Sequence, residues 1–156
     1  MDADRRAELL ERYKAGVGEV DSALAGAGEA ELDAVSGEGE WSARMVVHHL
    51  ADSESNSYIR VRTLLAEDDP LIQGYDEGQF ARRLHYDRPI DGSLAVFRAV
   101  RASTVELLEQ LADEDWSRAG THSESGPYSM DDWLEIYADH AFDHAEQIRR
   151  ARGTAG

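Results

Sequence analysis

The chain has 156 residues, of which 32 are acidic and 16 basic, and its formal charge is −16 at neutral pH. This length suits one domain with a substantial core, and the 42% hydrophobic and 31% charged fractions are typical of a soluble globular protein. So acidic a surface repels a phosphate backbone, which argues against nucleic-acid binding, and the absence of cysteine excludes disulfides, iron–sulfur clusters and a protein thiol nucleophile.

Helical periodicity begins close to the N-terminus. Apolar residues at near-helical spacing predict a first helix over residues 3–24. Ser42 is a good N-cap for a second long helix over residues 43–67. Pro70 follows two aspartates and ends that helix, because proline cannot continue the hydrogen-bond ladder. The first half of the chain therefore supplies two long helices.

A long connection separates this half from the next helix. Residues 70–90 are expected to carry one short helix, residues 77–83, with Asp76 as its N-cap. A connection of this length in a compact domain tends to be functional or to cover a site.

The second half of the chain also predicts two long helices. One spans residues 92–111, and the side expected to be buried consists of Leu94, Phe97, Val100, Val105, Leu108 and Leu111. Residues 115–128 are expected to be irregular. Ser129 and Asp132 resemble a capping box at the start of the last helix, which carries basic residues at its end as the helix dipole favours.

Four long helices and few clusters of β-branched residues predict an all-α fold. The expected architecture is a four-helix bundle that forms a single domain over residues 1–156, with strands largely absent. No apolar run approaches the ~18 residues of a membrane span, and the first six residues lack the apolar stretch of a signal peptide. A cytoplasmic protein without a membrane partner is expected.

Two histidines four residues apart, His140 and His144, are the most informative feature of the sequence. On a helix they share one face, separated by roughly 40° of rotation. Two neutral imidazoles held in this way can bind one divalent metal ion, although a helix surface that merely carries two histidines is the open alternative. A third ligand is expected from the second helix, where His49 is favoured and His48, about 100° away around the helix, is a flanking residue.

A polar stripe runs along the second helix at steps of three and four residues. It consists of His49, Asp52 or Ser53, Asn56 and Arg60. The stripe is either the solvent face of the helix or the wall of a polar, metal-containing cavity, because buried polar groups need partners. His85 and His122 fall in predicted loops, where exposed histidines are expected, and the loop of His122 leads directly into the last helix.

With these residues in hand, the chain resembles the DinB/YfiT-like superfamily of metal-dependent hydrolases and thiol transferases. The likeness covers residues 5–152 and looks closest to the YfiT branch, which resembles bacillithiol transferases. Its most specific segments are His48-His-Leu-Ala-Asp-Ser53 and the terminal His140-x-x-x-His144, and residues 41–47, 56–60, 67–70, 75–77, Trp116 and Tyr137 also match.

The resemblance implies a four-helix bundle with a three-histidine site for nickel or zinc, often in a homodimer. The matching ligand positions are His49, His140 and His144. One departure from the pattern lies nearby, since YfiT-like chains often have another histidine near Gln147.

The favoured function is a metal-dependent transferase that joins a low-molecular-weight thiol to an electrophile in detoxification or stress responses. In this hypothesis Arg60 or Asn56 contacts carboxylates of the thiol. The alternatives are a metal-dependent hydrolase that uses an activated water, with Asp52 or Asp143 as base, and a non-catalytic metal-binding dimer module. The predicted catalytic residues are thus Asp52, Asn56 and Arg60, beside the three histidines.

Overall fold

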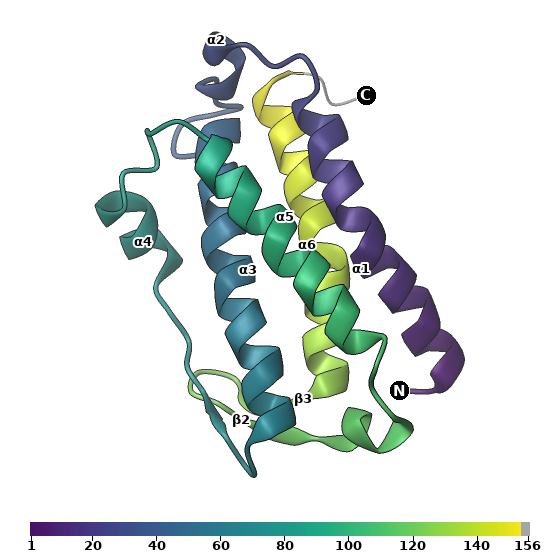
Figure 1. Ribbon diagram of the computed structural model, residues 1–156. Coiled ribbons are helices and arrows are strands. Elements are labelled where there is room, and N and C mark those ends of the chain that lie inside the picture. The colour runs from purple at the N-terminus through teal and green to yellow at the C-terminus, as the bar shows by residue number, and fades with distance from the viewer. Residues whose placement is uncertain (154–156) are drawn as a thin grey trace.

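A computed structural model describes residues 1–153, and the last three residues of the predicted domain lie outside the described part. Its helices are α1 (Ala3–Leu24), α2 (Glu29–Leu32), α3 (Ala43–Ala66), α4 (Glu77–Arg83), α5 (Asp91–Leu108), the 3₁₀-helix η1 (Asp113–Ser117) and α6 (Met130–Ala151). The four long helices α1, α3, α5 and α6 lie alongside one another as a bundle, so the predicted fold class is confirmed (Figure 1). Within residues 1–153, no helix is long and apolar enough to cross a membrane.

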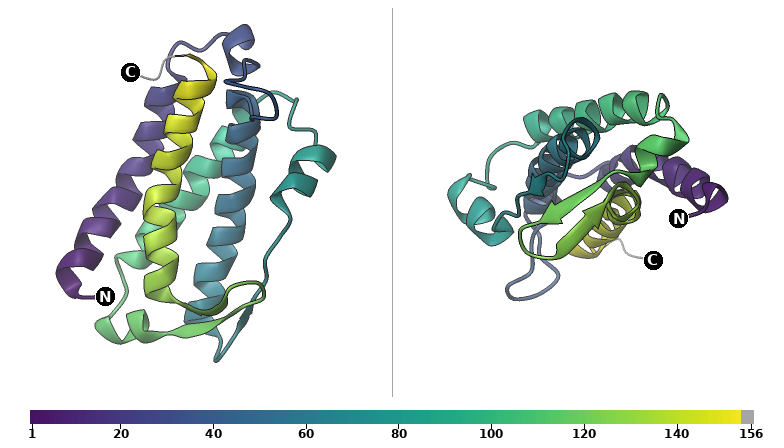
Figure 2. Two further views of the ribbon diagram at one scale, coloured as in Figure 1. Left: turned by 180° about the vertical axis from the view of Figure 1, so that it is seen from behind. Right: turned by 90° about the horizontal axis from the view of Figure 1, so that it is seen from below.

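The helices of the bundle pack in a defined order. Helix α1 packs most extensively on α6, and α3 packs on both α5 and α6 (Figures 1 and 2). The helix pair α3 and α6 therefore brings together two segments that are far apart in the sequence.

Three helices begin directly after the residues that were predicted to be their N-caps. Ser42 Oγ accepts a hydrogen bond from the backbone N–H of Met45 at 3.3 Å. Ser129 Oγ accepts one from the N–H of Asp132 at 3.1 Å, while the carboxylate of Asp132 accepts the N–H of Ser129 at 2.8 Å, which completes the capping box. Asp76 caps α4 in the same manner. The ends differ slightly from expectation, since α3 stops at Ala66 and α5 at Leu108.

A small sheet closes one end of the bundle, and here the prediction of an irregular segment was wrong. Strands β1 (Leu71–Ile72), β2 (Ala119–His122) and β3 (Gly126–Ser129) form it in the order β1-β2-β3. Strand β1 runs parallel to β2, and β3 runs antiparallel to β2 (Figure 2). The pairing was not foreseen because β1 comes from a distant segment and the hairpin turn depends on Gly126, whose φ of +84° suits glycine.

The core contains two clusters of buried apolar residues along the bundle, one around Trp133 and the other around Phe97. The buried side of α5 differs in part from the prediction. Phe97 and Leu108 are buried as expected, but the polar residues Arg101 and Thr104 are buried as well. They occupy the face next to the other helices, and Val100 and Val105 are only half-buried.

Candidate metal centre

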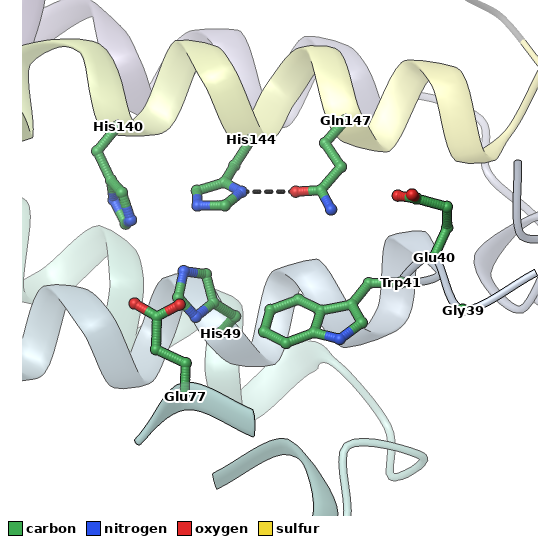
Figure 3. A pocket seen from close by; sticks show the side chains of 8 residues that line it. All are labelled: Gly39, Glu40, Trp41, His49, Glu77, His140, His144 and Gln147. Carbon is green, nitrogen blue, oxygen red and sulfur yellow. Dashed lines mark hydrogen bonds between the residues drawn. The ribbon is translucent and has the colours of Figure 1, made fainter. Parts of the chain in front are cut away.

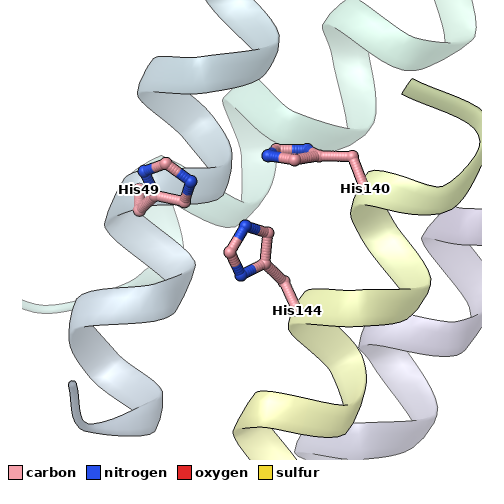
Figure 4. A group of neighbouring side chains, drawn as sticks. All are labelled: His49, His140 and His144. Carbon is pink, nitrogen blue, oxygen red and sulfur yellow. The ribbon is translucent and has the colours of Figure 1, made fainter. Parts of the chain in front are cut away.

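The three histidines named as ligands lie together between α3 and α6. Helix α3 contributes His49 and α6 contributes His140 and His144, and their rings are turned toward one another (Figure 4). One nitrogen atom from each ring lies within 4.8 Å of the other two. The ring centroids of His49 and His144 are 4.7 Å apart, and those of His140 and His144 are 4.6 Å apart. The convergence expected from the sequence is therefore present.

Helix packing places the rings at this point. Ala141 and Ala145 are fully buried on α6, beside the two histidines, and their small side chains let neighbouring helices approach closely. His49 is 2% exposed and His140 and His144 are half-buried, so the site is covered on the α3 side and open on the other.

Two of the three imidazoles, those of His49 and His144, are held in the neutral form. Burial, followed by the nearby His144 and His140, lowers the pKa of His49 to about 3. Burial, followed by His140, lowers the pKa of His144 to about 4. These two imidazoles are therefore unprotonated at neutral pH, and only the neutral ring can donate its lone pair to a metal ion.

Two of the rings are oriented by hydrogen bonds on their Nδ1 atoms. His144 Nδ1 lies 2.8 Å from Gln147 Oε1, and His140 Nδ1 lies 3.1 Å from Glu54 Oε1. Since both partners are oxygen acceptors, each Nδ1 is the donor in its hydrogen bond, and in a neutral ring with this tautomer Nε2 carries the lone pair. This arrangement, in which an oxygen atom holds the second nitrogen, is the one that metal-bound histidines usually show.

Glu54 is a site residue that sequence reasoning missed. Its carboxylate is 1% exposed and accepts a hydrogen bond at 2.8 Å from Arg101 on α5, which is equally buried. A partial signal was available, because each of these charged residues falls among positions of its helix that are mostly apolar or small. A charge in that position calls for an opposite partner, since burying an unpaired charge is costly.

The donor set fits a divalent cation. It consists of three imidazoles and contains no thiolate, a combination that suits zinc and nickel. With bonds of 2.0–2.1 Å, the ligand atoms of a tetrahedral zinc ion lie about 3.3 Å apart. The observed spread is 4.8 Å or less, so ligation requires the side chains to move closer together.

A pocket of about 390 Å³ opens onto the three histidines. Its other lining residues are Gly39, Glu40, Trp41, Glu77 and Gln147. The indole of Trp41 lies 5.1 Å from the ring of His49, and the carboxylate of Glu77 on α4 points toward the histidines (Figure 3). Glu77 is a second residue that sequence reasoning missed, since only the packing of α4 against α3 brings it to the pocket.

The predicted catalytic residues lie in different places. Asp52 accepts a hydrogen bond from the hydroxyl of Tyr86 at 2.7 Å, and Asn56 donates one to the backbone carbonyl of Asp52 at 2.8 Å. Neither residue is among those that line the pocket. Arg60 lines a second, smaller cavity next to it, together with Ser53. The polar stripe is thus split between two faces of α3.

The remaining histidines lie outside the cluster. His48 is buried, with Nδ1 2.7 Å from Ser93 Oγ and Nε2 2.9 Å from the carbonyl of Arg88, and burial lowers its pKa. It flanks the site, as expected. His85 is exposed in a turn with φ +52°. His122 belongs to β2 rather than to a loop, which corrects the prediction, and it lines the second cavity.

Comparison with known proteins identifies similar sequences. The sequence profile of the DinB superfamily matches residues 12–148. A protein of Oceanobacillus iheyensis named "putative metal-dependent hydrolase" is 38% identical over 118 residues, which cover 76% of this chain and 69% of that protein. A Bacillus cereus protein of the same name is 33% identical over 134 residues, which cover 86% of this chain and 78% of that protein.

Solved structures share the fold. The structure of YfiT from Bacillus subtilis, described as "a probable metal-dependent hydrolase with an unusual four-helix bundle topology", superposes with a TM-score of 0.88 at 27% identity. The match covers 95% of this chain and 86% of that chain. A mycothiol-dependent maleylpyruvate isomerase superposes with a TM-score of 0.73 at 14% identity over 92% of this chain and 60% of its own, which shows a shared fold.

Proposed function

The chain belongs to the DinB superfamily, and from that membership together with the geometry of its three histidines we propose that it is a metal-dependent enzyme. His49, His140 and His144 would hold the ion. The observation that carries the proposal is that three imidazoles converge at the base of an open pocket, two of them with strongly lowered pKa values. Three protein ligands leave room for a substrate atom, as catalytic sites require.

We propose thiol transfer as the reaction. A divalent ion held by these residues supplies Lewis acidity, which lowers the pKa of a thiol or a water molecule at the site. In the transfer, the thiol gives its proton to a base, the sulfur electron pair forms a bond to the electrophilic carbon, and the leaving group departs with its bonding electrons. Because the chain has no cysteine, the sulfur comes from a small molecule.

We assign the proton-accepting role to Glu77. Its carboxylate points into the pocket, whereas that of Asp52 is held by Tyr86 (Figure 3). Among the described residues, no hydrogen-bond donor or cation pairs with the Glu77 carboxylate, so it is free to take a proton. Trp41 offers an apolar wall for the electrophile. The fold shared with a mycothiol-dependent isomerase is compatible with a thiol substrate.

Hydrolysis is the second candidate, and the names of the relatives favour it. The same residues serve that reaction, with water in place of the thiol and Glu77 again accepting the proton. The two candidates differ in the nucleophile, so the choice of added substrate separates them.

We also propose the identity of the ion, the class of partner and the oligomeric state. The histidine donors support nickel or zinc as the ion, and the acidic surface supports an absence of nucleic-acid partners. A homodimer and a cytoplasmic location are proposed from the resemblance and from the sequence, and sedimentation of the purified protein would test the former.

The metal site is tested by elemental analysis of protein purified without chelator. The variants His49→Ala, His140→Ala and His144→Ala are each expected to lose most of the bound metal, because two imidazoles alone bind an ion far more weakly than three. His85→Ala is the matched control, since this histidine is exposed and outside the cluster. Full metal content in all three site variants would contradict the metal centre.

The reaction is tested on the metal-loaded protein. Thiol transfer predicts that a panel of small thiols reacts with an electrophilic bimane dye faster in its presence, and that esters and amides are left intact. Hydrolysis predicts the reverse. A fully loaded protein that is inactive in both assays would support the non-catalytic binding module instead.

A further inference from the structure

A second cavity of about 190 Å³ adjoins the histidine pocket. The two cavities share His140 and Glu77, so they meet at one of the proposed ligands. The second cavity is lined on its inner side by Ser53 and Arg60 of α3 and by Tyr137 of α6. A molecule that reaches the histidines can therefore extend toward Arg60.

Arg60 is a half-buried cation without an anionic partner. Its guanidinium donates hydrogen bonds to the hydroxyl of Tyr137 and to the backbone carbonyl of Gln73, both at 3.1 Å. Among the residues that the structure describes, no carboxylate forms an ion pair with it.

The two buried arginines are paired with carboxylates, whereas Arg62, half-buried like Arg60, stacks its guanidinium on the ring of Tyr58. Arg44 binds Asp33 at 2.6 Å, and Arg101 binds Glu54 at 2.8 Å. Two carboxylates, those of Glu77 and Glu124, also line the second cavity, but both residues are exposed and neither reaches the guanidinium. Arg60 therefore lines a cavity while pairing with no carboxylate of the described residues.

We propose that the second cavity binds a carboxylate of the substrate through Arg60, while the reactive atom of the same molecule lies at the three histidines. The placement of the reactive atom at the histidines rests on the proposed function, whereas the binding of a carboxylate by Arg60 does not. Guanidinium presents a planar set of N–H donors that matches a carboxylate, and the hydroxyls of Ser53 and Tyr75 in the same cavity provide further hydrogen bonds.

The geometry limits the distance between the carboxylate and the reactive atom. The Arg60 guanidinium contacts the hydroxyl of Tyr137, whose ring packs against that of His140 with 5.5 Å between centroids. The carboxylate is thus only two side-chain contacts from a proposed ligand. The second cavity, of about 190 Å³, takes the carboxylate end of the molecule, and the reactive end lies in the adjoining histidine pocket. The substrate class is a small acid whose carboxylate lies a few bonds from its reactive atom.

The experiment uses Co²⁺-loaded protein and two thiols of equal length, 3-mercaptopropionate and 3-mercaptopropionamide. Thiolate binding is followed by the absorption of the cobalt ion. The acid is expected to bind about 10-fold more tightly than the amide, the scale of one charge-assisted hydrogen-bonded pair. Arg60→Gln is expected to abolish this preference, and Arg60→Lys to retain part of it.

Arg62→Gln is the matched control. Arg62 lies two residues away on α3 but donates its hydrogen bonds to Ser103 and Thr104 of α5 and is not part of the cavity. The variant makes the same change of charge and is expected to keep the preference for the acid. Equal affinities for acid and amide in the unmodified protein would overturn the anion site and leave the thiol proposal standing.

A metal-free measurement separates the two proposals further. The NMR signal of the Arg60 side-chain Nε–H is expected to shift on titration with propionate and to stay in place with propionamide. If neither thiol binds the cobalt-loaded protein, the thiol proposal fails, and this titration still decides the anion site. An Arg60 signal that does not respond to propionate would then overturn it.

Discussion

At the level of single residues, the ligand histidines depend on what holds their Nδ1 atoms. His144 is held by Gln147 on the same helix, and His140 by Glu54 on α3. Gln147 also lies near the position at which the resembled family often has another histidine. The amide oxygen of Gln147 can orient the ring of His144, because it accepts the Nδ1 proton and so directs Nε2 toward the centre of the cluster.

Replacing Gln147 is expected to weaken metal binding. Gln147→Ala removes the acceptor that fixes the ring and tautomer of His144, and the affinity for Zn²⁺ should fall by about 10- to 100-fold. Competition with a chelating dye measures this. The control is Glu146→Ala, whose carboxylate is exposed and pairs with Arg150. Equal affinity of Gln147→Ala and the control would argue that the ring needs no such support.

Two carboxylates compete for the role of base. Glu77→Gln is expected to lower the turnover of the bimane reaction by about 10²- to 10⁴-fold, the range for loss of a general base, with metal content unchanged. Asp52→Asn should have a small effect, because that carboxylate is bound by Tyr86. The opposite order of the two variants would return the role to Asp52, one of the two bases named from the sequence.

At the level of elements, the close approach of α1 to α6 determines where the ligand helix lies. Gly16 of α1 has no side chain at this contact, and there is no room for one. A Cβ added at Gly16 would lie 2.7 Å from Ala141 Cβ and 3.2 Å from the guanidinium of Arg101. Ala141 directly follows His140, so this contact lies next to a proposed metal ligand. Gly18, in the same helix, has no such neighbour within 4 Å.

These two glycines form a matched pair for measurement. Gly16→Ala is expected to lower the free energy of unfolding by about 1–3 kcal/mol, because overpacking moves α6 or Arg101. Gly18→Ala should raise it by about 0.5–1 kcal/mol, since alanine is the better helix former in open space. Urea denaturation measures both. An increase in the free energy of unfolding for Gly16→Ala would contradict close packing of α1 against α6 at this position.

At the level of the whole molecule, Arg101 connects all four long helices. It projects from α5, binds Glu54 of α3, and donates hydrogen bonds at 3.0 Å to the carbonyls of Tyr13 on α1 and Tyr137 on α6. Its guanidinium also stacks on the ring of Tyr13, 3.9 Å from the centroid. Since Glu54 in turn holds His140, the framework of the bundle and the metal centre share one polar network.

Removing this arginine is expected to be costly. Arg101→Met leaves the Glu54 carboxylate buried without its cation, which should lower the free energy of unfolding by about 3–5 kcal/mol. Arg98→Met is the control on the same helix. It breaks an exposed pair with Asp21 and should cost less than about 1 kcal/mol. Thermal unfolding compares the variants, and similar midpoints would show that the buried pair adds little to stability.

Local chemistry alone was sufficient for much of this protein. Helix starts at Ser42 and Ser129 follow from side chains that bond to backbone N–H groups within three residues, and the long helices follow from apolar spacing. The pairing of His140 with His144 likewise needs only the pitch of a helix. Such features depend on neighbours in the sequence, so they can be read before any tertiary contact is known.

Other features depend on how the helices are rotated and packed. Ser53 lies one turn from His49 and faces His140 at 3.3 Å, whereas Asp52, about 100° around the helix, faces Tyr86. The sheet, the burial of Glu54 with Arg101, and the approach of Glu77 to the pocket all join segments far apart in the chain. These contacts are stabilised by interactions between residues that are distant in the sequence. A local sequence pattern therefore does not predict which residues form them.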